Sequence, residues 1–328
     1  MKKRGTGMGI MWYPVGPGGP NPSTARMVMD KSAKITLYVG SPDVGQGSNT
    51  ALAQIAADTV GVPFEWIKVV ATDSDSTVGD FGSVGSRVTY VQGNSVRMAA
   101  ESLKARLLEA AQEMTKTPAE ELEIGFGLPQ DRKNALDIVK VARHAIDGKG
   151  ALETTGTFVP EGMVTDRVKG QGMVYPTYVY ATQIVEVEVD TGTGEVKLLR
   201  MVAAHDSGVL LNPMLVEGQI AGGIAQGIGM AMSEEVMVSE GRVLNPSLSN
   251  YLIPTTMDIP DLEFVHVEMP EDTGPYGAKC VGEPALVATT PAILNAIYDA
   301  VGVRITALPA TPERVLDAIY NQAPQLVA

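Results

Sequence analysis

A single carboxylate stands in an otherwise mostly small and apolar stretch of the sequence, Gly274–Leu286. It belongs to Glu283, which lies between Gly282 and Pro284. Glycine leaves room for another group to approach the backbone, and proline fixes the backbone that follows. A carboxylate kept away from water has its ionised form disfavoured, so its pKa rises towards the range of a general base. The stretch is therefore a candidate catalytic site, and the alternative is a surface turn whose glutamate is solvated.

A Gly-Gln-Gly turn joins a predicted strand, Ile35–Val39, to a predicted helix, Ser48–Val60. The first N–H groups of a helix have no partner inside it, and together with the helix dipole they attract oxyanions. A glutamine between the glycines offers both a donor and an acceptor. A ligand-free turn is the alternative to an anion site here. The turn consists of Val44, Gly45, Gln46 and Gly47.

A second loop rich in glycine and serine follows the predicted strand Trp66–Ala71. Its part Gly79–Arg87 can offer backbone donors, two hydroxyls and one cation. The amphipathic helix Gly93–Thr115 comes next, and its charged residues are most simply a solvated face. Neither loop has the spacing of a dinucleotide-binding fingerprint or a Walker loop.

The predicted helix from Pro213 to about Met232 contains five glycines. Each glycine inside a helix costs about 1 kcal/mol relative to alanine, so the five need a compensating reason. Close approach of another backbone or of a large cofactor is such a reason. Gln219 and Gln226 are the polar groups of this surface, and with Glu217 they argue against a membrane helix.

The rest of the chain alternates between strand and helix patterns, with a hairpin turn at residues 190–194. A helix is predicted after Glu283, with Thr290 as N-cap and Pro291 as its first residue. The other predicted strands are Ala151–Val159, Val179–Val189, Glu195–Ala204, Glu235–Val238 and Leu262–Val267. The other predicted helices are a short one from Thr117, then Ala135–Ala145, Pro291–Ala300 and Pro312–Tyr320.

Composition narrows the class of protein. The chain has 328 residues, 45% of them apolar and 19% charged, as is ordinary for a globular protein. Its net charge of −13 argues against a nucleic-acid partner. One cysteine excludes an internal disulfide and a cysteine-ligated cluster, and the three histidines lack metal-ligand spacing. No stretch is apolar enough to span a membrane, so we expect a soluble, cytoplasmic chain.

Several separated motifs together resemble the xanthine dehydrogenase/aldehyde oxidase family of molybdenum hydroxylases. The resemblance runs from about residue 35 to the end and corresponds to the C-terminal half of the family's molybdopterin-binding subunit. The closest resemblance is to the medium molybdopterin subunit of nicotinate dehydrogenase. The motifs are Val44–Gly47, Gly82–Arg87, Tyr276–Pro284, the run through Asp206, Gly208, Asn212, Pro213, Gly218 and Gln219, and Leu308–Arg314.

The resemblance assigns roles to individual residues. It implies that Glu283 is the general base in the hydroxylation of an electron-poor carbon, with water as the oxygen source. It implies no protein ligand to the metal, because the dithiolene of the pterin holds the molybdenum. The residues that it assigns to cofactor binding are Val44, Gly45, Gln46, Gly47, Ser83, Val84, Gly85, Ser86, Gln219, Lys279, Cys280, Val281 and Gly282.

The same resemblance implies the cofactor and the partner chains. The cofactor would be a molybdopterin dinucleotide, in the cytosine form, with molybdenum and a terminal sulfido or selenido ligand. A large molybdopterin subunit would carry the missing N-terminal half. An FAD subunit and a [2Fe-2S] iron–sulfur subunit would carry electrons away, because the single cysteine of this chain cannot ligate a cluster.

The implied fold is α+β, with two mixed α/β lobes of the molybdopterin-binding domain. We predict a first lobe at residues 35–150 and a second at residues 151–328. Residues 1–34 are rich in glycine and proline and show no periodicity, so they are predicted to be extended and to pack on a partner chain.

Three points stay open at this level. The substrate can be a nicotinate-type N-heterocycle, a purine or an aldehyde, because the family's substrate-positioning residues lie mostly in the absent half. A non-catalytic scaffold or assembly subunit is the alternative from another class. Cys280 stands where the family commonly has glycine or alanine, and it is either a small buried side chain or an oxidation-sensitive thiol near the cofactor.

Overall fold

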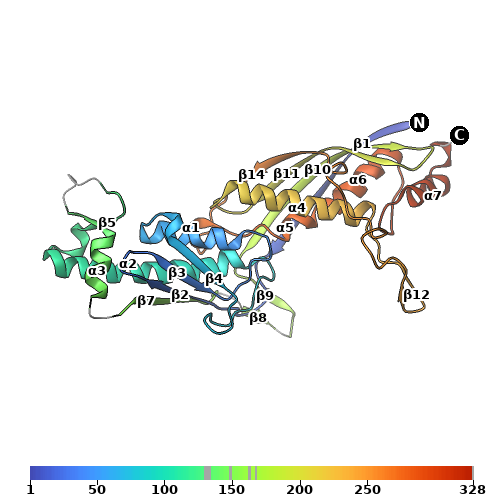
Figure 1. The fold of residues 1–328 in the computed structure, drawn as a ribbon. Coiled ribbons are helices and arrows are strands. Elements are labelled where there is room, and N and C mark those ends of the chain that lie inside the picture. The colour runs from blue at the N-terminus through green and yellow to red at the C-terminus, as the bar shows by residue number, and fades with distance from the viewer. Residues whose placement is uncertain (129–133, 148–149, 162–163, 167, 327–328) are drawn as a thin grey trace. The chain divides into compact units, whose positions relative to one another are not determined.

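The computed structural model describes residues 1–128, 134–147, 150–161, 164–166 and 168–326. The chain divides into two compact units, each built from segments that are far apart in the sequence. Unit 1 consists of Met1–Tyr13, Tyr178–Met269 and Val281–Ala328, and unit 2 of Pro14–Thr177 and Pro270–Cys280. Each unit combines a four-stranded sheet with helices, which confirms the predicted α+β fold with two mixed lobes (Figure 1).

The sheet of unit 1 has the strand order β1-β10-β11-β14. Strands β10 and β11 form the antiparallel hairpin predicted from the turn at residues 190–194, and β14 lies parallel to β11. Alternate residues of β10 are buried, so one face of the sheet points to the core. The strands are β1 (Lys2–Pro14), β10 (Tyr178–Asp190), β11 (Val196–Asp206) and β14 (Asp261–His266).

Helices pack on the inner face of that sheet. Branched apolar residues of strand β10 and of two helices form one buried cluster, which includes Val185 of β10, Ile224 of the helix Pro213–Met232 and Ile293 of the helix Thr289–Val301. The helices are α4 (Pro213–Met232), α5 (Pro284–Val287), α6 (Thr289–Val301) and α7 (Pro312–Gln322), with a short 3₁₀ turn η5 (Pro324–Leu326). A small hairpin joins β12 (Val238–Ser239) to β13 (Arg242–Val243).

The glycines at the start of the chain let strand β1 lie directly on helix α6. A Cβ built on Gly7 would come within 2.1 Å of the backbone nitrogen of Ala296, and Gly5 and Gly9 have equally close neighbours in or just before that helix. The residues between these glycines point outward and are exposed. Glycine at every second position therefore replaces the apolar alternation that usually marks a strand, and this is why the sequence showed no periodicity here.

The sheet of unit 2 has the strand order β4-β3-β2-β7. Strand β2 is antiparallel to both β3 and β7, whereas β3 and β4 are parallel. The strands are β2 (Ser23–Met29), β3 (Ile35–Val39), β4 (Ile67–Ala71) and β7 (Leu152–Phe158). Short pairs are formed by β5 (Glu123–Gly125) with β6 (Ala135–Asp137), and by β8 (Val164–Asp166) with β9 (Gln171–Met173).

The described part of unit 2 contains three α-helices: α1 (Ser48–Val60), α2 (Gly93–Thr115) and α3 (Ile138–Ile146). The first two have the bounds that the apolar spacing predicts. A π-helical turn, η2 (Val88–Gln92), leads directly into α2. Single 3₁₀ turns are η1 (Phe64–Trp66), η3 (Ala119–Glu121) and η4 (Pro275–Gly277).

The structure differs from the sequence-based expectations in three respects. The division into units does not follow the predicted boundaries 1–34, 35–150 and 151–328, because β1 joins the sheet of the second half of the chain and Pro270–Cys280 returns to unit 2. The predicted helix Ala135–Ala145 begins as strand β6, and Asp137 caps α3 by accepting from two backbone N–H groups. Of the predicted strand Glu235–Val238, only Val238 lies in a strand, the two-residue β12.

Candidate functional site

The Gly-Gln-Gly turn has the backbone that its glycines predict. Gly45 has φ +112° and Gly47, the N-cap of α1, has φ +80°. Both values lie in the region that favours glycine. A Cβ built on Gly45 would meet nothing within 4 Å, so its surface is open to an incoming group. The turn thus combines two backbone conformations that favour glycine with free space at Gly45.

The N-terminus of α1 already has a partner within the chain. The carboxylate of Asp43 accepts from the backbone N–H groups of Gly45 (2.9 Å), Gly47 (3.3 Å) and Asn49 (3.0 Å). Burial opposes ionisation of Asp43, but these hydrogen bonds outweigh it and lower the pKa of the carboxyl. These three N–H groups, of which only that of Asn49 lies within α1, are therefore already paired and do not await an anion.

Gln46 connects the two predicted cofactor loops. Its Oε1 accepts from the backbone N–H of Val44 (2.6 Å), and its Nε2 lies within donating distance of the carbonyl of Pro42 (2.9 Å). The same Nε2 lies 3.4 Å from the hydroxyl of Ser83, which itself donates to Pro42 (2.5 Å). The structure therefore brings Val44–Gly47 and the start of the Ser83–Ser86 loop together, as the shared assignment required.

Arg87 fixes the second loop from beneath. Its side chain is fully buried, and its guanidinium pairs with the buried carboxylate of Asp80 at 2.6 Å. Burial lowers the pKa of Arg87, and Asp80 opposes that shift. The remaining donors reach Oδ1 of Asn21 (3.1 Å), the carbonyls of Gly82 (3.3 Å), Asn21 (2.8 Å) and Pro22 (3.0 Å), and the hydroxyl of Ser23 (2.7 Å). A guanidinium with so many partners is a structural anchor and not a ligand-binding cation.

The backbone of the second loop is tightly turned. Gly85 has φ +59° and Ser86 has φ +52°, which is uncommon for a residue with a side chain. A Cβ on Gly85 would lie 2.7 Å from the backbone of Gly16, whose N–H donates to the carbonyl of Gly85 (2.6 Å). The turn leaves Ser83 and Val84 exposed. The loop therefore presents a fixed exposed edge.

Glu283 lies at the start of helix α5, and its side chain is exposed. The dry setting that we predicted for this carboxylate is not provided by the described part of this chain. The chain is already helical from Pro284, and Thr290 does not act as an N-cap: its hydroxyl donates to the carbonyl of Gly227 in α4 (3.0 Å). The predicted helix therefore begins earlier than expected.

A buried amide holds the segment that follows Glu283. Gln183 of β10 donates to the carbonyl of Ala285 (2.7 Å) and accepts from the hydroxyl of Thr289 (2.6 Å). All three residues are buried. Gln183 was not predicted as a site residue, although the sequence holds a signal: it is the one polar residue at the inward positions of β10 from Val179 to Val189.

Four of the five glycines of α4 fall into two groups. A Cβ on Gly223 would lie 2.5 Å from Cβ of Ala285, and one on Gly227 would lie 2.4 Å from Cβ of Thr289. These two glycines therefore allow α5 and the start of α6 to pack closely on α4. Gly218 and Gly222 have nothing within 4 Å of such a Cβ and are exposed. Gln219 lies between them and is half-buried, so an external group could approach this side of the helix.

The remaining assigned residues lie on either side of the point where the chain passes from unit 2 to unit 1. Lys279 and Cys280 are buried, and Val281 and Gly282 are partly exposed. Burial of Cys280 agrees with a small packed side chain, the simpler of the two readings.

The exposed groups of these segments fit a pterin cofactor, whose ring edges carry several hydrogen-bond donors and acceptors. Glycine backbone, an amide and a hydroxyl are gathered at the Val44–Gly47 and Ser83–Ser86 loops, and the space at Gly45 is open. In the described ranges, no three His, Cys, Asp or Glu side chains gather as a metal site would require. No helix in those ranges has the length and hydropathy to cross a membrane.

Comparison with known proteins agrees with this arrangement. Residues 1–260 match the molybdopterin cofactor-binding domain family. The chain is 33% identical over 324 residues to the putative xanthine dehydrogenase molybdenum-binding subunit XdhA of Escherichia coli, which covers 97% of this chain and 42% of that protein. It is 34% identical over 316 residues to the nicotine 6-hydroxylase large subunit of Paenarthrobacter nicotinovorans, covering 92% of this chain and 38% of that protein.

Among solved structures, the aldehyde oxidoreductase of Desulfovibrio gigas is similar with a TM-score of 0.81 and 32% identity, covering 97% of this chain and 32% of that chain. The chain thus spans well under half the length of these relatives. The match to the cofactor-binding family covers most of this chain, and the relatives by sequence and by structure agree with it. The chain therefore belongs to the molybdopterin cofactor-binding family of the molybdenum hydroxylases.

Proposed function

We propose that this chain is the medium molybdopterin-binding subunit of a cytoplasmic, heteromeric molybdenum hydroxylase. The enzyme would hydroxylate an electron-poor carbon of a nicotinate-type N-heterocycle with water as the oxygen source. The net reaction replaces a ring C–H by C–OH and releases two electrons and two protons. Glu283 would act as the general base.

The observation that carries the proposal is the junction of the two assigned loops. Gln46 holds the Gly-Gln-Gly turn in shape and lies 3.4 Å from Ser83 at the start of the other loop. Asp43 and Arg87 fix the two loops from within the chain, so their exposed edges are preorganised for a ligand. Val44, Gly45, Gly47, Val84, Gly85 and Ser86 complete this surface.

The attacking oxygen, which comes from water, would give its proton to one of the carboxylate oxygens of Glu283. Because its side chain is exposed in this chain, the desolvation that raises a carboxylate pKa must come from bound groups or a partner chain. Gln183 fixes the carbonyl two residues later, which orients the segment that carries the base. Gln219, Lys279, Cys280, Val281 and Gly282 are the other residues that we assign to cofactor binding.

The bound cofactor would supply the redox chemistry, as molybdenum with a terminal sulfido or selenido ligand on a molybdopterin cytosine dinucleotide. A single cysteine cannot ligate an iron–sulfur cluster. Electrons would therefore leave through a [2Fe-2S] subunit and an FAD subunit. A large subunit would carry the rest of the molybdopterin-binding structure, since this chain spans 42% of the xanthine dehydrogenase relative.

The relatives bear on the substrate. One is named a nicotine 6-hydroxylase subunit and another a xanthine dehydrogenase subunit, and both names refer to nitrogen-containing rings. This supports an N-heterocycle for the present chain. The similarity to an aldehyde oxidoreductase supports a second candidate reaction, the oxidation of an aldehyde. The similarity to a xanthine dehydrogenase subunit supports a purine as the N-heterocycle.

Purification of the chain with the subunits that accompany it in its native host tests the proposal. Metal content, the nucleotide released by acid, and dye reduction with nicotinate, xanthine and benzaldehyde would be measured on the same sample. We expect molybdenum, a cytosine nucleotide and nicotinate-dependent reduction. A preference for xanthine or benzaldehyde would replace the substrate assignment only. A chain that carries neither metal nor nucleotide would indicate a non-catalytic scaffold or assembly subunit.

The base assignment has its own test. Glu283→Gln keeps the shape of the side chain but cannot accept a proton, and removal of a general base typically lowers turnover by about 100-fold or more. We expect that loss of kcat with unchanged molybdenum content and subunit composition. Glu240→Gln, at an exposed glutamate next to β12, is the matched control. Substantial activity in the Glu283 variant would refute the assignment.

A further inference from the structure

The outer face of the unit 1 sheet is divided into a charged half and an apolar half. In the charged half, cross-strand ion pairs satisfy the side chains: Lys2 and Arg4 of β1 pair with Glu188 of β10, and Arg200 of β11 pairs with Glu263 of β14. Self-paired charges of this kind are suited to contact with water. This half of the face needs no partner.

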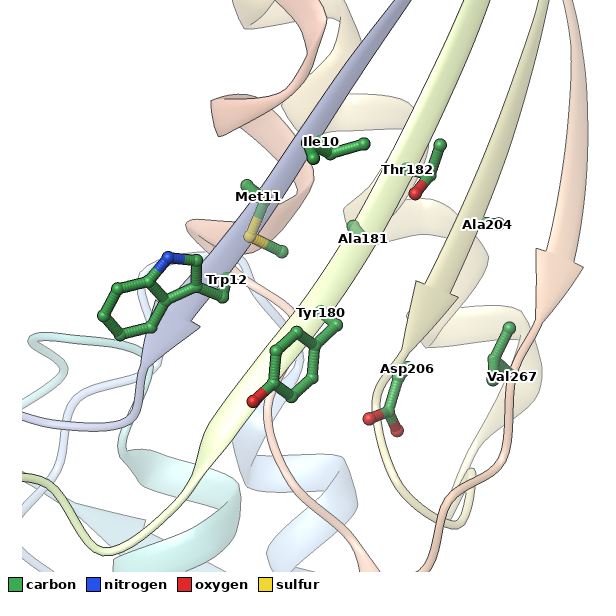
Figure 2. A pocket seen from close by; sticks show the side chains of 9 residues that line it. All are labelled: Ile10, Met11, Trp12, Tyr180, Ala181, Thr182, Ala204, Asp206 and Val267. Carbon is green, nitrogen blue, oxygen red and sulfur yellow. The ribbon is translucent and has the colours of Figure 1, made fainter.

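The other half of the same face is apolar and remains exposed. Ile10 is 69% exposed, Trp12 66% and Tyr180 56%. They line a hollow of about 560 Å³ together with Thr182, Ala204, Asp206 and Val267, from three neighbouring strands and the residue after the fourth (Figure 2). We call this surface the apolar face and define it by Met8, Ile10, Trp12, Tyr180, Val265 and Val267. A largely apolar exposed surface of this kind is typical of a protein interface.

The edge of the sheet beside this face is protected against addition of a strand. The backbone N–H of Thr6 donates to Asp299 (2.9 Å), and the carbonyl of Met8 accepts from Asn295 (2.9 Å), both on helix α6. Side chains that satisfy the backbone groups of an edge strand prevent another strand from pairing there. A partner would therefore bind through the face of the sheet and not by extending it.

The lengths of the relatives bear on the choice of partner. The reported relatives align with this chain over 42% or less of their own length, so more than half of each relative lies outside the match. We propose that the large molybdopterin subunit, which would supply that remainder, packs on the apolar face. This inference rests on the proposed function. The outward side chains of β1 would contact the partner, whereas the glycines on the other side of β1 pack on α6.

Site-specific cross-linking in the purified, assembled complex tests the interface. The photo-reactive residue p-benzoylphenylalanine would replace Ile10 in one sample and Arg4 in another. Both positions are exposed on the same strand and the same face. We expect a cross-link to the large subunit from position 10 and none from position 4. A cross-link from position 10 to a second copy of this chain, or to the iron–sulfur or flavin subunit, would overturn the proposal.

A pair of substitutions adds a quantitative test. Burial of an isoleucine side chain contributes enough free energy that Ile10→Gln should weaken binding of the large subunit about tenfold or more. Arg4→Gln, which introduces the same side chain in the ion-paired half, should change it less than threefold. Equal effects, or none, would overturn the interface. Molybdenum is measured on the same complex: a molybdenum-containing complex without the cross-link refutes the interface alone, whereas absence of molybdenum refutes the proposed function.

Discussion

Among the single residues of the site, the side chains that fix geometry are more deeply buried than those assigned to chemistry. Asp80, Arg87 and Gln183 are buried with their hydrogen-bonding groups paired, whereas Glu283 and Ser83 are exposed. A buried polar group that lost its partner would cost free energy, so such residues hold one arrangement of the backbone around them. Preorganisation of this kind lets exposed groups act without first being ordered.

Gln183 offers the clearest test at this scale. Gln183→Leu would remove the closest partner of the buried carbonyl of Ala285 and of the buried hydroxyl of Thr289, and would leave them only their 3.4 Å contact with each other. We expect the free energy of unfolding to fall by about 2–4 kcal/mol, because each unsatisfied buried group costs about 1–3 kcal/mol. Denaturant unfolding measures the loss.

The matched control for this prediction is Gln112→Leu, at an exposed position of helix α2. Thr289→Val should cost less than Gln183→Leu, and the double variant should be less destabilised than the sum, because the two side chains share one hydrogen bond. If Gln183→Leu and Gln112→Leu behaved alike, Gln183 would not hold the segment after Glu283.

At the scale of elements, the glycines of helix α4 differ in their surroundings: Gly223 packs against another helix, whereas Gly218 faces open space. Gly223→Ala would force a methyl group against Ala285, so we expect a loss of about 1–3 kcal/mol of stability. Gly218→Ala places its methyl group in open space and should stabilise the helix by about 1 kcal/mol. Thermal unfolding of the two variants measures the difference, and two changes of the same sign would show that packing does not distinguish these glycines.

The elements themselves follow largely from the sequence, whereas their surroundings do not. Apolar spacing gives the bounds of α1 and α2, and alternation gives β10 within a residue at each end. Strand β1 escapes such reasoning because glycine occupies its inward positions, and only the position of α6 explains them. The pairing of Asp43 with the backbone N–H of Asn49 was likewise missed, since a carboxylate before a glycine turn is equally compatible with a solvated loop.

At the scale of the whole molecule, contiguous stretches of sequence do not correspond to compact units. Residues 1–13 join residues 178–269 and 281–328, and residues 270–280 return to the other unit. Pairing between distant strands determines this division, and local patterns carry no information on it. The site residues were proposed from motif resemblance, which does not depend on such pairing. Glu283 is exposed in this chain, so the dry setting predicted for it depends on what surrounds the chain and stays a prediction.

The stability of unit 1 should depend on pH through His205. Burial, with a smaller contribution from His266, lowers the pKa of His205 from 6.5 to about 4. Between these values the unfolded chain binds a proton that the folded chain does not, so folding is weakened as pH falls from 6.5 to 4. The contribution reaches about 3 kcal/mol, since one pKa unit corresponds to about 1.4 kcal/mol.

Unfolding free energies at pH 7 and pH 4.5 test this dependence by comparison with a variant. His205→Gln removes the titrating group, so its loss of stability between the two pH values should be smaller than that of the unaltered protein. His144→Gln, at a half-exposed histidine, should leave the loss unchanged. An equal loss in all three proteins would show that His205 takes up a proton in the folded state as readily as in the unfolded one. The buried histidine would then not link folding to pH.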